Sequence, residues 1–95
     1  MSITDVITDQ ILNQFKERMH LGDEEDDNLR RILSASFKVL QRLIPGTDLG
    51  DEEFKELVFE RSRYVYNDAL EYFNNNFSSN ITSLQLAKAL EEGDG

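Results

Sequence analysis

Cysteine and tryptophan are absent from this 95-residue chain, and proline occurs only once. The lack of cysteine excludes disulfides, thiolate zinc sites and cysteine nucleophiles, and a reducing cytoplasm is then the default compartment. The N-terminal stretch, residues 1–14, has no basic start and no apolar run. We therefore predict neither a signal peptide nor a membrane span.

Positive charge is also scarce, because ten lysine and arginine residues face nineteen aspartates and glutamates, for a net charge of -9. Such a charge repels nucleic acid and anionic lipid. The mass of 11.0 kDa predicts one domain. A chain of this size buries roughly 60 to 65 % of its unfolded surface, which leaves little room for a large enclosed substrate cavity.

Apolar residues recur at three- and four-residue steps through most of the chain, which predicts an all-α fold. The predicted small bundle has three main helices, at about 4–19, 27–44 and 51–73. Pro45 and Gly46 end the second helix, Asp51 caps the third, and the run of asparagines at 74–76 ends it. A short C-terminal helix or an extended tail follows. We assign residues 1–77 to the bundle and 78–95 to a docking tail within a single domain.

Residues with catalytic or metal-binding chemistry are few. His20 is the only histidine and lies near the end of the first helix, where a structural role fits. In the acidic run 23–27, Asp23, Glu25 and Asp27 fall at alternate positions, as the first ligands of an EF-hand loop do. However, Asn28 occupies the glycine position of such a loop and Ser34 the position of the bidentate glutamate. We interpret the run as a solvated helix start. The sequence predicts no enzyme, no cofactor and no metal site.

Charged residues of the third helix are more informative about structure. Glu56 and Glu60 lie four residues apart on one face, and the simplest interpretation is a solvated face rather than an acid/base pair. Glu60 and Arg63 have the spacing of a surface ion pair. Arg61 falls in register with the apolar stripe, so we expect it to form an ion pair within the bundle or across a subunit boundary.

Aromatic residues gather near the end of the third predicted helix, with few basic neighbours. This combination favours protein contacts over base stacking. We predict that part of the group belongs to the core and that the rest forms a contact surface. The residues of this candidate surface are Tyr64, Tyr66, Tyr72 and Phe77.

Three segments together carry a resemblance: FKERMH at 15–20, EEDDNL at 24–29, and above all ERSRYVYNDALEYF at 60–73. In this order of short helix, acidic loop, helix and long helix, residues 7–77 resemble the small head-tail connector, or adaptor, proteins of long-tailed bacteriophages and prophages. The most distinctive stretch is the Arg-x-Arg-Tyr-x-Tyr-Asn-Asp segment at 61–68.

This resemblance implies a non-enzymatic subunit of the virion neck, which assembles in the host bacterial cytoplasm. The expected partners are the portal protein above, the head-closure protein below and further copies of the chain, with about a dozen copies closing a ring. DNA would pass through the ring without sequence-specific binding, and no membrane is involved. By the same likeness, the C-terminal segment would dock on the portal through Ile81, Leu84, Leu86 and Leu90.

Other classes remain open on the residues alone. An acidic helical protein of this size also fits a DNA mimic or a small regulatory module that occupies a basic site on another protein. A helix-turn-helix regulator is disfavoured because the second helix carries only four positive side chains between acidic loops. An enzyme ranks last because the chain lacks the residues for one.

Overall fold

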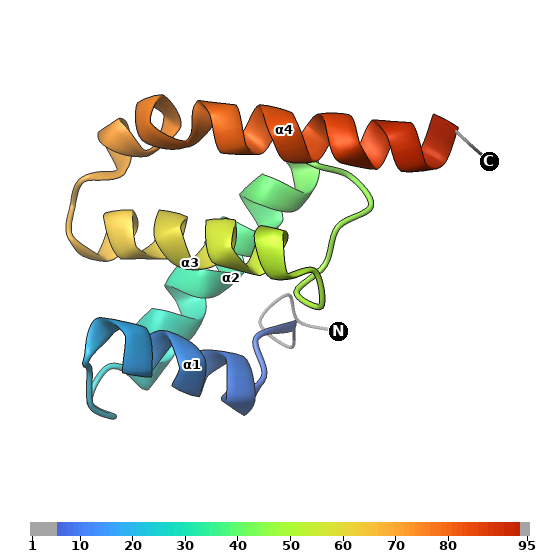
Figure 1. Ribbon diagram of the computed structural model, residues 1–95. Coiled ribbons are helices and arrows are strands. Elements are labelled where there is room, and N and C mark those ends of the chain that lie inside the picture. The colour runs from blue at the N-terminus through green and yellow to red at the C-terminus, as the bar shows by residue number, and fades with distance from the viewer. Residues whose placement is uncertain (1–5, 94–95) are drawn as a thin grey trace.

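The computed structural model describes residues 6–93, which fold into helices with no strand among them. Helix α1 spans Asp9–Met19, α2 spans Asp26–Leu43 and α3 spans Glu52–Tyr66. A short 3₁₀ turn, η2 at Leu70–Tyr72, leads into α4 at Phe73–Gly93. The predicted all-α bundle of three main helices and a C-terminal helix is confirmed (Figure 1).

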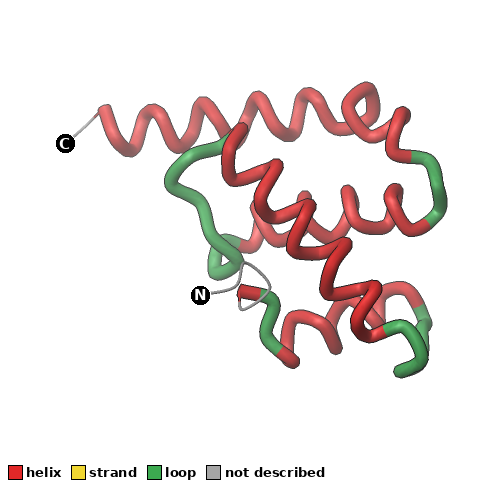
Figure 2. The backbone as a smooth tube through the Cα atoms, turned by 180° about the vertical axis from the view of Figure 1, so that it is seen from behind, coloured by secondary structure: helices red, strands yellow, loops and turns green. Residues whose placement is uncertain are grey.

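The helices are arranged around α3. Helix α4 runs back along α3 in the opposite direction, and α1 lies on the other side of α3 (Figure 1). Helix α2 crosses behind α3 and lies nearest the viewer when the molecule is turned round (Figure 2). The molecule measures 45 × 31 × 20 Å. Its longest helix, α4, extends past the rest of the bundle at its C-terminal end.

One hydrophobic core joins all the helices, and most of its side chains are less than 6 % exposed. Aromatic rings meet where α3 contacts each of the other helices. Phe15 of α1 contacts Phe59 of α3 with ring centroids 5.6 Å apart, and Phe37 of α2 meets Phe54 edge-on at 5.7 Å. The remaining buried hydrophobic residues are Ile7, Leu12, Leu29, Leu33, Leu40, Ile44, Leu57, Val58, Phe73, Ile81 and Leu84.

Two of the helix starts show side-chain caps. Thr8 caps α1, its hydroxyl accepting from the Ile11 amide at 3.2 Å. Helix α1 therefore begins at Asp9, later than the predicted start, which lies outside the described residues. Asp51 caps α3 as predicted and accepts from the amides of Glu53 at 3.0 Å and Phe54 at 3.3 Å. Helix α2 agrees with its predicted range to within one residue.

Helices α1 and α3 end in the same motif. His20 and Asp68 adopt left-handed backbone angles, with φ of 58° and 56°. In each case the next residue's amide bonds a carbonyl five residues back, Leu21 to Lys16 at 2.9 Å and Ala69 to Tyr64 at 2.8 Å. This is the Schellman arrangement, in which glycine is the usual left-handed residue. His and Asp are among the few other residues that tolerate it.

The predicted end of the third helix at residue 73 is wrong. The helix stops at Tyr66 because Asp68 turns left-handed, and a new helix starts at Phe73. The asparagines at 74–76, which were expected to end the third helix, lie in the first turn of α4. Phe73 stacks on Phe77 at 5.0 Å, and both rings meet Tyr64 edge-on at 5.8 Å. Tertiary packing outweighs the weak helix propensity of asparagine here.

The C-terminal segment is a helix of 21 residues, much longer than the predicted two turns or extended tail. It runs without a break across the predicted boundary between the bundle at 1–77 and the docking tail at 78–95. Its inward stripe is Phe73, Phe77, Ile81 and Leu84, spaced by four, four and three residues. The tail assigned to residues 78–95 is therefore packed against the bundle over part of its length.

This packing predicts a contrast between two leucines only two residues apart on α4. Leu84 is 4 % exposed and Leu86 is 60 % exposed. Leu84→Ala should lower the free energy of unfolding by about 2–4 kcal/mol because it leaves a cavity in the core. Leu86→Ala, the matched control, should change it by less than about 0.5 kcal/mol. Urea denaturation followed by circular dichroism measures both, and equal losses would contradict this placement of α4.

Candidate functional site

Helix α4 is attached to the bundle along one face only. Ile81 and Leu84 are buried in the core. Further along, the Gln85 amide nitrogen donates to the carbonyl of Leu43, at the end of α2, at 2.8 Å. The Lys88 ammonium pairs with Asp51, the cap of α3, at 3.1 Å. These contacts fix which side of α4 faces outward.

Leu86 and Leu90 occupy the outward side. They are 60 % and 62 % exposed and lie four residues apart, one helical turn, so they form one small apolar patch. We call Leu86 and Leu90 the outer leucines. They lie in the C-terminal half of α4, on the side opposite Ile81 and Leu84. The four residues predicted to dock on the portal therefore fall into two pairs. Ile81 and Leu84 are buried in the core of this chain, and only Leu86 and Leu90 are exposed.

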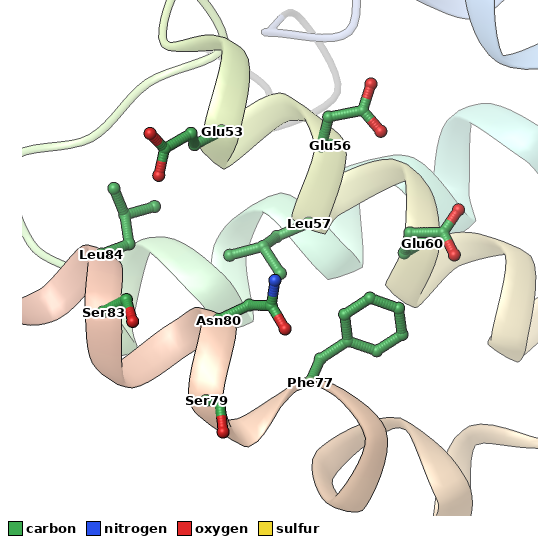
Figure 3. Close-up of a pocket in the computed structure, with 9 residues that line it drawn as sticks. All are labelled: Glu53, Glu56, Leu57, Glu60, Phe77, Ser79, Asn80, Ser83 and Leu84. Carbon is green, nitrogen blue, oxygen red and sulfur yellow. The ribbon is translucent and has the colours of Figure 1, made fainter.

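A groove of about 410 Å³ lies between α3 and α4 (Figure 3). Leu57, Phe77 and Leu84 supply its apolar floor. Glutamates line the α3 side, and small polar side chains line the α4 side. These rim residues are Glu53, Glu56, Glu60, Ser79, Asn80 and Ser83. We call this feature the α3–α4 groove.

Two arginines reach the glutamates on the α3 rim. Arg18 of α1 pairs with Glu56 at 2.6 Å and with Glu60 at 3.2 Å. Arg63 pairs with Glu60 at 2.7 Å, which confirms the spacing argument for that pair. Glu53 forms no ion pair with any residue in the 6–93 range. The negative charge left on the groove is therefore greatest at the Glu53 end.

Arg61 forms no ion pair with any carboxylate among the described residues. Its guanidinium donates instead to the Ser36 hydroxyl of α2 at 3.1 Å. Burial lowers the pKa of Arg61, because the half-buried guanidinium loses solvation without a compensating charge. The alternative role of Arg61 and Arg63 in a subunit contact stays a prediction.

The four aromatic residues predicted as a contact surface lie in different environments. Tyr64 and Phe77 are half-buried and pack on Phe73. The Tyr66 hydroxyl donates to the carboxylate of Glu25, before α2, at 2.5 Å. Tyr72 alone is largely exposed, at 58 %. The group mainly holds the α3–α4 corner together, and Tyr72 is its most exposed member.

The acidic run before α2 already has a cationic partner. The ammonium group of Lys16, on α1, lies 2.5 Å from Asp23 and 2.9 Å from Asp26. These contacts raise the pKa of Lys16 and lower that of Asp23. Within residues 6–93 no group of three or more His, Asp or Glu residues is arranged to hold a metal ion. The acidic run leads into the first turn of α2, and Lys16 of α1 holds it in place.

Comparisons with known protein families, characterised proteins and solved structures found no match to this chain. No helix within the described residues combines the length and the apolar character needed to cross a bilayer.

The Arg18 contact predicts the titration of Glu56. The hydrogen bond and charge of Arg18 hold the pKa of Glu56 below its ordinary value. The resulting stabilisation is complete above that ordinary value and is lost as the pH falls through the lower folded-state pKa. Arg18→Gln should raise the Glu56 pKa toward its ordinary value. Carbon-detected NMR titration of the side-chain carboxyl measures the change, and an identical pKa in both proteins would rule out the contact.

Proposed function

We propose that this chain is a non-enzymatic assembly subunit, a head-tail connector of a long-tailed phage or prophage. It forms a ring between the portal and the head-closure protein at the virion neck, and DNA passes through this ring during packaging and ejection. The observation that carries the proposal is the pair of outer leucines on the exposed side of α4. The sequence resemblance over residues 7–77 supplies the identity of the partners.

The outer leucines provide a docking element of a familiar kind. A helix that is held on one face and apolar on the other can place its free side in a groove of a partner. Burying one leucine side chain contributes about 1.5–3 kcal/mol. Gln85 and Lys88 hold this part of α4 on the bundle, so the two leucines are presented on a preformed helix. The acceptor in our proposal is the portal.

The overall charge suits a channel protein. A net charge of -9 repels the DNA backbone, and an acidic lumen would let DNA slide without adhering. Assembly would take place in the host bacterial cytoplasm, before the tail is attached. The proposal assigns the chain no catalytic residue and no cofactor.

A second candidate function rests on the α3–α4 groove. Its glutamate rim, on which Glu53 has no ion pair with the described residues, favours an acidic regulatory module or DNA mimic that binds a basic protein. Such a module would act as a monomer or dimer, and added salt would weaken its binding. Binding to the portal through the outer leucines would instead be largely apolar and less sensitive to salt.

The test of portal docking uses point variants. Deleting residues 78–95 would also remove Ile81 and Leu84 from the core, so lost binding could reflect unfolding. The double variant Leu86→Glu/Leu90→Glu should instead weaken binding to the portal protein of the same genome by about tenfold or more, because charge replaces apolar contact. Its unfolding midpoint should stay unchanged, since both side chains are exposed. Biolayer interferometry on the immobilised portal measures the affinity.

The matched control is Asn74→Glu/Asn75→Glu, which adds the same charge at two exposed positions in the first turn of α4. This variant should bind the portal as the wild type does. Wild-type affinity in the leucine variant would overturn the docking assignment. A wild type that does not bind the portal at all would overturn the connector function.

A further inference from the structure

A row of basic side chains lies along the exposed face of α2. Arg31, Lys38 and Arg42, with Ala35 between them, follow steps of four, three and four residues, so they share one helical face. All four residues are exposed. None of the three basic residues forms an ion pair within the described chain. We call Arg31, Lys38 and Arg42 the basic row.

The basic row faces away from the rest of the bundle. The opposite side of α2 carries Leu33, Phe37 and Leu40, which are buried in the core. Helix α2 lies behind α3 in one view and in front of it in the reverse view (Figures 1 and 2). The α3–α4 groove receives no residue from α2. The row and the groove therefore belong to different faces of the molecule.

Among the described residues, Glu53 on the groove rim and the three cations of the basic row form no ion pair, so opposite charges are left on the two surfaces. From Glu53 to Glu60 the acidic rim extends about 10 Å along α3, and from Arg31 to Arg42 the basic row extends about 16 Å along α2, at 1.5 Å per residue. The groove offers an apolar floor under a glutamate rim. Lysine and arginine have the complementary form, with an apolar stem and a cationic end.

A contact between two different faces of identical chains is heterologous. Each copy then offers one groove and one basic row, so copies add head to tail and close a ring when the rotation between them allows it. A self-complementary dimer would instead need a single patch that pairs with itself. The separation of the two surfaces on this chain fits the first kind of assembly.

We propose that the basic row of one copy docks in the α3–α4 groove of a second copy. Lys38 and Arg42 lie over the apolar floor, and their cationic ends meet the glutamate rim, above all at Glu53. The contact supplies the subunit boundary of the ring, and in this respect it rests on the proposed connector function. Added salt weakens it, because Glu53 and the basic row are exposed in the free chain.

The test measures the mass of the assembled protein by sedimentation velocity, alone at increasing concentration and with the portal added. The wild type forms an oligomer in at least one of these conditions. Glu53→Lys and Lys38→Glu each weaken the self-association by about tenfold or more, since like charges then face each other. The double variant Glu53→Lys/Lys38→Glu, whose net charge equals that of the wild type, restores it.

Glu71→Lys is the control for charge alone, because Glu71 is exposed on η2 and outside the groove. It should assemble as the wild type does. Single variants that still form the wild-type oligomer overturn the proposed contact while portal binding through the outer leucines stands. A wild type that remains a monomer in both conditions also overturns it. A Lys38→Glu variant that assembles normally but loses binding to duplex DNA would also overturn the contact, because the basic row would then bind nucleic acid.

Discussion

Helix α3 contacts every other helix, and a pair of aromatic rings forms part of each of these contacts. Phe59 meets α1 and Phe54 meets α2, while Tyr64 meets the start of α4. A chain of this size can build only one core, so a central helix shared by all its neighbours is an efficient solution. The position of α3 also fixes the surfaces of the molecule. Its free side becomes one wall of the α3–α4 groove, and α4 is held so that the outer leucines project.

Much of this arrangement could be predicted from the sequence. Periodic apolar residues located α1, α2 and the start of α3, and the cap at Asp51 was visible as an aspartate before two glutamates. The spacing of Glu60 and Arg63 predicted their ion pair. These features are local, since each depends on residues only a few positions apart.

The predicted helix boundaries were wrong where contacts between residues distant in the sequence determine the structure. The apolar stripe continues through Val65 and Ala69, and nothing within it signals the left-handed turn at Asp68. Tyr64 lies more than eight residues before Phe73, and its ring contacts the rings of both Phe73 and Phe77. These contacts favour a helical conformation for the asparagines between the two phenylalanines.

The helical phase of α4 determines which of the C-terminal leucines are buried and which are exposed. Phe73, Phe77, Ile81 and Leu84 follow one helical stripe, and Leu86 and Leu90 fall outside it. A sequence analysis that placed the start of α4 at residue 73 could have used this helical phase to predict which residues are buried. Without that start, the sequence does not distinguish the two buried aliphatic residues, Ile81 and Leu84, from the two exposed ones. Arg61 illustrates the same limit, because its Ser36 partner lies 25 residues away on α2.

The central claim is that copies of this chain form a ring on the portal. The most direct test is light scattering of the purified chain with the portal protein of the same genome, which gives the absolute mass of the complex. We predict that about twelve chains join one portal ring. A chain that stays monomeric or dimeric, with a mass unaffected by the portal, would contradict the account.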